Sequence, residues 1–218
     1  QVRYLVVDWA ENELNMLVRD KVFEQSEIML IPYQGAHDTI SPQHITSDKK
    51  EWVDPDLYSA TGGDAPGAHP GFQNNGAGAW RQPGRVRLTS TGGINVINKI
   101  QEVINGIQHP AGTKLKVFFL CSVAGGTGSG TIVDLVYMTR YVLETSFAGL
   151  YNNTCIFGYI FSPSACEGGI NEERNPGANH YAAMKEIAYL MRLGDRGEKI
   201  KMNYGITNVT FNRNIFDT

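Results

Sequence analysis

The sequence predicts an α/β fold with three layers, a mostly parallel sheet covered by helices on both faces. Two observations predict it. Residues 115–123 (LKVFFLCSV) and 154–161 (TCIFGYIF) are continuous apolar runs, typical of strands inside a parallel sheet. Such runs alternate along the chain with helical patterns, as in residues 94–107, where six isoleucine or valine side chains share one face. In sheets of this kind, ligands bind at the carboxyl ends of the strands.

The remaining elements follow from the same two periodicities. In chain order we expect a strand at 2–7, a helix at 11–23, the helix at 94–107, the strand at 115–123, a helix at 131–147, the strand at 154–161, a helix at 179–193 and a strand at 209–216. Between 35 and 84 the apolar periodicity vanishes, and Gly, Pro, Asp, Asn and His dominate. We therefore expect one domain over 1–218 that contains a long loop-rich segment at 35–84.

The composition excludes several classes of protein. Of the 218 residues, 42% are hydrophobic and 19% charged, as in ordinary globular proteins. The net charge of -3 provides no basic field, so we expect no nucleic-acid partner. No apolar run approaches the about 20 residues of a membrane span. Three cysteines without a CxxC motif indicate a reducing compartment, the cytoplasm, and the scattered histidines predict no metal site made by the protein alone.

The strongest functional signal is the segment 124–131, AGGTGSGT, which lies between a predicted strand and a predicted helix. The start of a helix has unpaired backbone amides and a partial positive charge, so it attracts phosphate. Glycine lets the backbone approach a ligand closely. The hydroxyl groups of Thr127, Ser129 and Thr131 are candidate donors to phosphate or ligands of a phosphate-bound Mg²⁺.

Three other interpretations of this segment were weighed. A Walker loop needs a lysine after its glycines, and none follows here. A Rossmann fingerprint needs a third glycine where Thr131 stands, which leaves an unrelated Rossmann-like enzyme as a weak alternative. A simple tight turn does not need four glycines among the six residues from Gly125 to Gly130. Phosphate binding is the interpretation that accounts for the pattern.

AGGTGSGT resembles the GGGTGSG signature of the tubulin/FtsZ superfamily, with Ala124 in place of the first glycine. Other segments resemble the same superfamily in the same order. They are VRYLVVDWAENEL at 2–14, similar to its second strand and following loop; NGAGA at 75–79 with PGR at 83–85, similar to the FtsZ loop near the terminal phosphates; SACEG at 164–168, similar to the ribose loop; and NHYAAMKEIAYLM at 179–191, similar to divergent bacterial tubulin-like proteins.

The resemblance implies a role for each matching residue. The α- and β-phosphates would be held by Ala124, Gly125, Gly126, Thr127, Gly128, Ser129 and Gly130. The γ-phosphate would face Gly76, Ala77 and Gly78, and Glu167 would accept hydrogen bonds from the ribose hydroxyls. Arg85 is a candidate for a nucleotide-linked role, with a surface ion pair as the alternative. Asp8 and Glu11 are candidates for holding Mg²⁺ through water.

The chain departs from the superfamily pattern at several places. Ala10 stands where the superfamily often carries an acid, and Asn171 stands where FtsZ has an arginine. The resemblance places a first glycine-rich loop before Val2. It also places the central helix and the acidic catalytic loop after Thr218, so we expect no complete catalytic set within these residues.

The function that the resemblance implies is a GTPase that binds GTP or GDP with Mg²⁺ and assembles head to tail into cytoskeletal filaments. Hydrolysis would be completed by the acidic loop of the adjacent subunit, so this chain alone would be inactive. The partners would be further copies of the chain, with accessory proteins as additional candidates. The alternative is a nucleotide-binding sensor or scaffold that does not polymerise, which the long 35–84 segment favours. We also expect Gly128→Val to weaken nucleotide binding without unfolding the domain.

Overall fold

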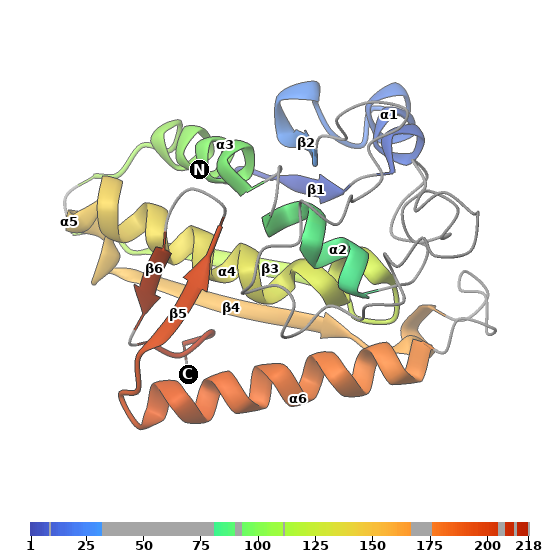
Figure 1. Cartoon of the computed structure of the whole chain (residues 1–218). Helices are drawn as coiled ribbons and strands as arrows, with labels where there is room; N and C mark the ends of the chain where they lie inside the picture. Colours follow the sequence, from blue (N-terminus) through green and yellow to red (C-terminus); the bar gives the residue numbers. More distant parts are fainter. Residues whose placement is uncertain are drawn as a thin grey trace.

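The computed structural model describes residues 1–8, 10–31, 81–89, 93–110, 112–166, 176–204, 208–211 and 213–217. Within these ranges the fold is mixed α/β (Figure 1). The elements are β1 (Val6–Asp8), α1 (Glu11–Arg19), β2 (Ile28–Leu30), α2 (Arg81–Arg87), α3 (Gly93–Asn105), β3 (Leu115–Ser122), α4 (Gly126–Ser146), α5 (Ala148–Tyr151), β4 (Thr154–Phe161), α6 (Pro176–Asp195), β5 (Ile200–Asn203) and β6 (Asn208–Phe211), with single 3-10 turns at Gln25–Glu27 and Pro163–Cys166.

The strands form three pairs, two of them parallel. β1 pairs with β2, so that Asp8 stands opposite Leu30 at their carboxyl ends. β3 pairs with β4 along their full length, from Leu115 opposite Thr154 to Ser122 opposite Phe161. β5 and β6 form an antiparallel pair. The parallel pairs confirm that part of the predicted fold class and align the carboxyl ends of β3 and β4, where the glycine-rich segment begins.

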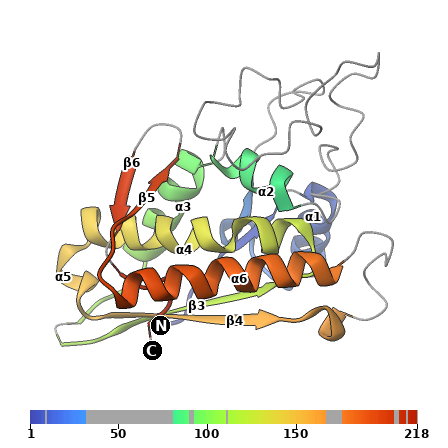
Figure 2. The same ribbon diagram turned by 60° about the horizontal axis from the view of Figure 1, so that its bottom comes forward.

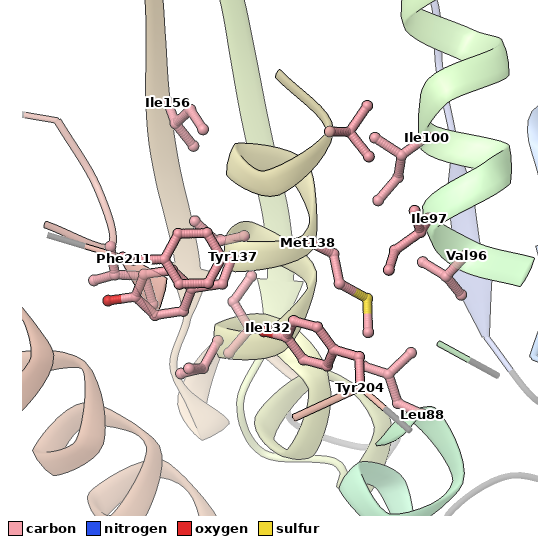
Figure 3. Packing of buried hydrophobic residues seen from close by; sticks show 14 of the residues in the cluster. Leu88, Val96, Ile97, Ile100, Ile132, Tyr137, Met138, Ile156, Tyr204 and Phe211 are labelled. Atoms are coloured by element: carbon pink, nitrogen blue, oxygen red, sulfur yellow. The ribbon is translucent and has the colours of Figure 1, made fainter. Parts of the chain in front are cut away.

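Helix α4 is the centre of the described molecule. It packs on β3 and contacts α2, α3 and α6, and Figure 2 shows α4 and α6 on the same side of the β3–β4 pair. Its side chains are therefore buried around most of its circumference. In Figure 3, Met138 points toward Val96, Ile97 and Ile100 of α3, while Tyr137 lies against Phe211, with ring centroids 4.7 Å apart. Burying each such side chain contributes about 1.5–3 kcal/mol.

The two faces of the β3–β4 pair differ. Inward side chains such as Val117 and Ile156 pack in the core under α4. On the opposite face Leu120 is 66% exposed, Phe118 and Phe161 are also exposed, and Phe118 stacks on Phe157 with ring centroids 5.3 Å apart. The sequence predicts helices on both faces, but the helices of the described residues cover only one. The sequences of β3 and β4 are continuous apolar runs because the outward face carries apolar side chains as well as the inward face.

Several predicted elements have different bounds. The strands at 115–123 and 154–161 and the helix at 94–107 are confirmed. The predicted first strand is shorter because its partner β2 spans only three residues, and the predicted last strand ends at Phe211. The sequence did not predict helix α2 or the strands β2 and β5. Residues 81–84 of α2 fall within the segment predicted to be loop-rich, so that prediction is wrong for these four residues. The sequence RQPGRVR has no helical periodicity, but α2 is held by packing on α4, with Val86 fully buried.

None of the helices within the described ranges combines the length and apolar character needed to cross a membrane.

Candidate phosphate-binding site

The glycine-rich segment begins as an extended backbone and then becomes the first turn of α4. Gly125 is the N-cap residue, with φ -85° and ψ 169°, and the helix starts at Gly126, not at 131 as the sequence predicted. The first intrahelical bond runs from Ser129 N to Gly125 O at 3.4 Å. The amides of Gly126, Thr127 and Gly128 precede it, and no side-chain hydrogen bond caps this helix start. We call residues 124–130 the glycine turn.

The glycines of this turn have two different roles. Among the described residues, a Cβ added at Gly125 would meet nothing within 4 Å, so this position faces open space with respect to them. A Cβ at Gly128 would lie 2.1 Å from the Ser122 carbonyl oxygen, and one at Gly130 would lie 2.3 Å from the Arg81 carbonyl oxygen. These two glycines therefore let α4 approach β3 and α2. Gly128→Val would push α4 off β3, so the structure predicts that this substitution disturbs the fold, in contrast to the prediction from the sequence.

The hydroxyl groups of the turn are directed at protein acceptors. Thr127 Oγ1 donates to Asp8 Oδ1 at 3.1 Å, and Thr131 Oγ1 donates to the Thr127 carbonyl oxygen at 2.7 Å. Ser129 Oγ donates to the Gly125 carbonyl oxygen. Because each hydroxyl has one proton, these groups are not free to donate to phosphate in this conformation. The backbone amides at the helix start are the donors that remain.

Polar contacts hold the turn from several sides. At its beginning, Ala124 N donates to Ser122 Oγ at 3.2 Å, and Asn179 Nδ2 of α6 donates to the Ala124 carbonyl oxygen at 2.9 Å. At its end, Arg81 Nε of α2 donates to the Ser129 carbonyl oxygen at 3.0 Å. Together with the contact to Asp8, these bonds fix the turn against β1, α2 and α6. The amides are thus held in place before any ligand arrives.

Arg85 belongs to a charged cluster behind the turn. Arg85 Nε lies 3.0 Å from Asp134 Oδ2, and Arg85 Nη1 lies 3.0 Å from Glu186 Oε1. Burial alone would lower the pKa of Arg85, but Asp134 and Glu186 outweigh it and raise the pKa. For Asp134, burial has the opposite effect and raises the pKa, although the neighbouring Arg85 acts to lower it. The surface ion pair considered for Arg85 is therefore a largely buried one, which joins α2, α4 and α6.

With this geometry established, comparison with known proteins decides the family. A family model described as tubulin-like matches residues 1–217. The chain belongs to the tubulin-like family. No curated protein and no solved structure matches it. The predicted resemblance of the chain to tubulin-like proteins is thus confirmed at the level of the family.

The structure brings one of the two candidate acids of the tubulin-like chain to the turn. Asp8 ends β1 and contacts Thr127, and the Ala10 amide donates to the same Asp8 Oδ1 at 3.4 Å. Glu11 is exposed at the start of α1. Among the described residues, no three His, Cys, Asp or Glu side chains gather where they could hold a metal ion. Of the side chains that the structure describes, Asp8 is the acidic one that contacts the turn.

Other predicted site residues lie outside the described residues. These are Gly76, Ala77, Gly78 and Glu167, together with residues 35–80 of the loop-rich segment. Their predicted roles stay predictions.

Sequence reasoning did not predict that Arg81 and Asn179 would contact the turn or that Glu186 would bind Arg81 behind it. For Asn179 and Glu186 the sequence held a weak indication, namely their spacing along the predicted helix. They are two helical turns apart, so they share one face of α6. Cys121, at the end of β3 beneath the turn, is a further neighbour. Burial raises the pKa of its thiol to about 11, so it behaves as a small apolar side chain rather than as a nucleophile.

Proposed function

We propose that this tubulin-like chain binds the phosphates of GTP or GDP at the glycine turn. The observation that carries the proposal is the open space at Gly125 beside the uncapped amides of Gly126, Thr127 and Gly128. Phosphate oxygens accept hydrogen bonds from such amides and are favoured by the helix dipole. The family membership supports the guanine nucleotide as the ligand. In the same proposal, Gly76, Ala77 and Gly78 face the terminal phosphate and Glu167 binds the ribose.

The charges around the turn support a nucleotide that brings its own Mg²⁺. The turn contains no lysine, and the adjacent side chain Asp8 is acidic. A helix start supplies only about half an elementary charge, which is far less than the charge of a diphosphate. Asp8 would orient water bound to Mg²⁺ that enters with the nucleotide, while Thr127 holds its carboxylate in place. In this arrangement the metal is held mainly by phosphate oxygens and water.

We further propose that the tubulin-like protein assembles head to tail into filaments and that an acidic loop of the adjacent subunit completes GTP hydrolysis. A heterologous interface of this kind generates open polymers. Positioning of the attacking water by the neighbour makes hydrolysis depend on assembly.

We also propose that the strand pairs belong to one mostly parallel sheet with helices on both faces. The apolar second face of β3–β4, with Phe118, Leu120, Tyr159 and Phe161 exposed, supports this arrangement. Four large apolar side chains on one surface are what a second helical layer would cover.

Calorimetric titration with GTP, GDP, ATP and NAD in the presence of Mg²⁺ tests the ligand. We expect binding of GTP and GDP in preference to ATP and NAD. The matched pair of variants is Gly125→Asp and Gly149→Asp, because an added Cβ meets nothing within 4 Å at either position. Gly125→Asp should weaken nucleotide binding by at least about tenfold, or about 1.4 kcal/mol, with an unchanged melting temperature. Preference for NAD, or normal affinity of folded Gly125→Asp, would contradict the proposal.

Sedimentation tests the assembly. At high protein concentration with Mg²⁺, we expect more pelletable polymer with GTP than with GDP. If guanine nucleotides bind but no polymer pellets with any nucleotide, the filament proposal fails and the non-polymerising sensor or scaffold is favoured.

A further inference from the structure

Four charged side chains from three helices meet behind the glycine turn. The carboxylate of Glu186 on α6 accepts from two arginines of α2, with Oε2 2.7 Å from Arg81 Nη2 and Oε1 3.0 Å from Arg85 Nη1. Arg85 also pairs with Asp134 of α4. With all four groups ionised the cluster is neutral, so it adds no net charge to the adjacent site. Its contribution is geometric, because it fixes α2 and α6 to α4.

Arg81 connects this cluster to the glycine turn. Its Nε donates to the Ser129 carbonyl oxygen at 3.0 Å while its Nη2 is held by Glu186. Its own carbonyl oxygen lies against Gly130, where even a Cβ would come within 2.3 Å. The first turn of α4 therefore cannot shift without moving Arg81. A planar guanidinium with two fixed partners is a rigid spacer.

Helix α6 is connected to both ends of the glycine turn, directly at the first end and through Arg81 at the second. Asn179 donates directly to the Ala124 carbonyl oxygen at 2.9 Å, and Glu186 reaches the Ser129 carbonyl through Arg81. Asn179 and Glu186 are two helical turns apart, about 10 Å along the helix axis, on the same face of α6. A stiff helix thus sets the separation between the first and last parts of the turn, and the three uncapped amides lie between these two contacts.

We propose that Glu186 is a positioning residue for phosphate binding. Through Arg81 it holds the Ser129 carbonyl, and so keeps in place the helix start that carries the amides of Gly126, Thr127 and Gly128. The inference rests on the proposed function of the turn, because it assigns the amides a phosphate ligand. Glu186 is the informative member of the cluster. Its side chain is 26% exposed, so water can replace a lost bond, whereas Asp134 is 1% exposed and its loss would leave Arg85 without a buried partner.

The test is Glu186→Gln in this chain, with GDP and GMP titrated separately in Mg²⁺. The amide replaces one of the two carboxylate oxygens by an NH2 donor, which would face one of the arginines, so the two bonds from Arg81 and Arg85 to separate oxygens cannot both form. The gain in affinity from GMP to GDP, which measures the contribution of the second phosphate, should fall about three- to tenfold. Amide hydrogen exchange of residues 126–129 in the ligand-free variant should accelerate, while exchange in the rest of α4 stays unchanged. Arg81→Lys keeps the charge but cannot bind Ser129 and Glu186 at the same time through a planar guanidinium. It should show the same loss of affinity gain and the same faster exchange, and it replaces Glu186→Gln as the test if that variant does not fold.

Glu198→Gln is the matched control. Glu198 pairs with Arg196 at 3.6 Å on the exposed surface and has no contact with the turn among the described residues. It should leave both affinities unchanged. Equal weakening of GMP and GDP binding in Glu186→Gln, or no change in either, would overturn the inference. If the unaltered chain shows no gain from GMP to GDP, the proposed function fails first, and the inference with it.

Discussion

Helix α4 has polar groups at both ends, but at one end they pair with other protein groups and at the other three backbone amides lack intrahelical partners. At the far end, Arg140 is 2% exposed and pairs with Asp217 at 3.1 Å, and Asp217 in turn exchanges bonds with the backbone of Ile156 at 2.7 and 2.9 Å. At the start, three amides lack intrahelical partners and Gly125 faces open space. Protein groups pair with Asp217 in the first arrangement, whereas in the second nothing among the described residues lies within 4 Å of a Cβ added at Gly125. The same helix thus carries a structural end and an end that we propose binds phosphate, which we call the binding end.

The largest expected effect is at the far end. Asp217→Ala removes the carboxylate that pairs with Arg140 and leaves this buried arginine without its ionic partner. We expect the free energy of unfolding to fall by about 3 kcal/mol. Urea unfolding measures it, and Asp195→Asn, an exposed position, is the control. The comparison predicts that the protein remaining folded binds GDP normally. A loss of GDP affinity as large as the loss of stability would show that the two ends are not separate.

The second effect concerns the packing of the binding end. Gly130→Ala places a Cβ 2.3 Å from the Arg81 carbonyl oxygen, so α2 and α4 must move apart. We expect a loss of about 2 kcal/mol in the free energy of unfolding. GDP binding should weaken as well, because Arg81 also holds Ser129. Gly149→Ala, which adds the same methyl group in open space, should change neither quantity. Normal stability of Gly130→Ala would mean that the helices are not in close contact there.

The smallest of these effects concerns a single hydrogen bond. Thr127→Val keeps the shape of the side chain but removes the hydroxyl that donates to Asp8 at 3.1 Å. We expect a loss of about 1 kcal/mol in stability and a higher Mg²⁺ concentration for half-maximal GDP binding. Thr127→Ser retains the hydroxyl and should behave nearly as the unaltered chain does. An unchanged Mg²⁺ requirement in Thr127→Val would separate Asp8 from the metal.

The sequence was sufficient to locate the binding end. A strand, a run of glycines and a helix specify a helix start whose amides lack intrahelical partners, although the sequence placed this start at 131 and the structure has it at Gly126. The strands β3 and β4 could also be predicted, because short continuous apolar runs bounded by turn residues are typical of buried strands.

The contacts that stabilise the binding end could not be predicted from the sequence. α2 contains Pro83 and Gly84 and shows no periodicity, so its helical structure depends on packing against α4. The contacts of Arg81 with Glu186 and of Thr127 with Asp8 join residues far apart in the sequence. Arg85 illustrates the same limit, because a charged residue in a polar segment gives no sign of the buried carboxylate that it will meet.

The most direct test of the binding end is an amide NMR titration of the ¹⁵N-labelled chain with Mg²⁺ and GDP. We expect saturable shifts of the amides of Gly125, Gly126, Thr127 and Gly128, with little change in the amides around Arg140 at the other end of α4. Shifts confined to the far end of the helix, or saturable GDP binding that leaves those four amides unmoved, would contradict this expectation.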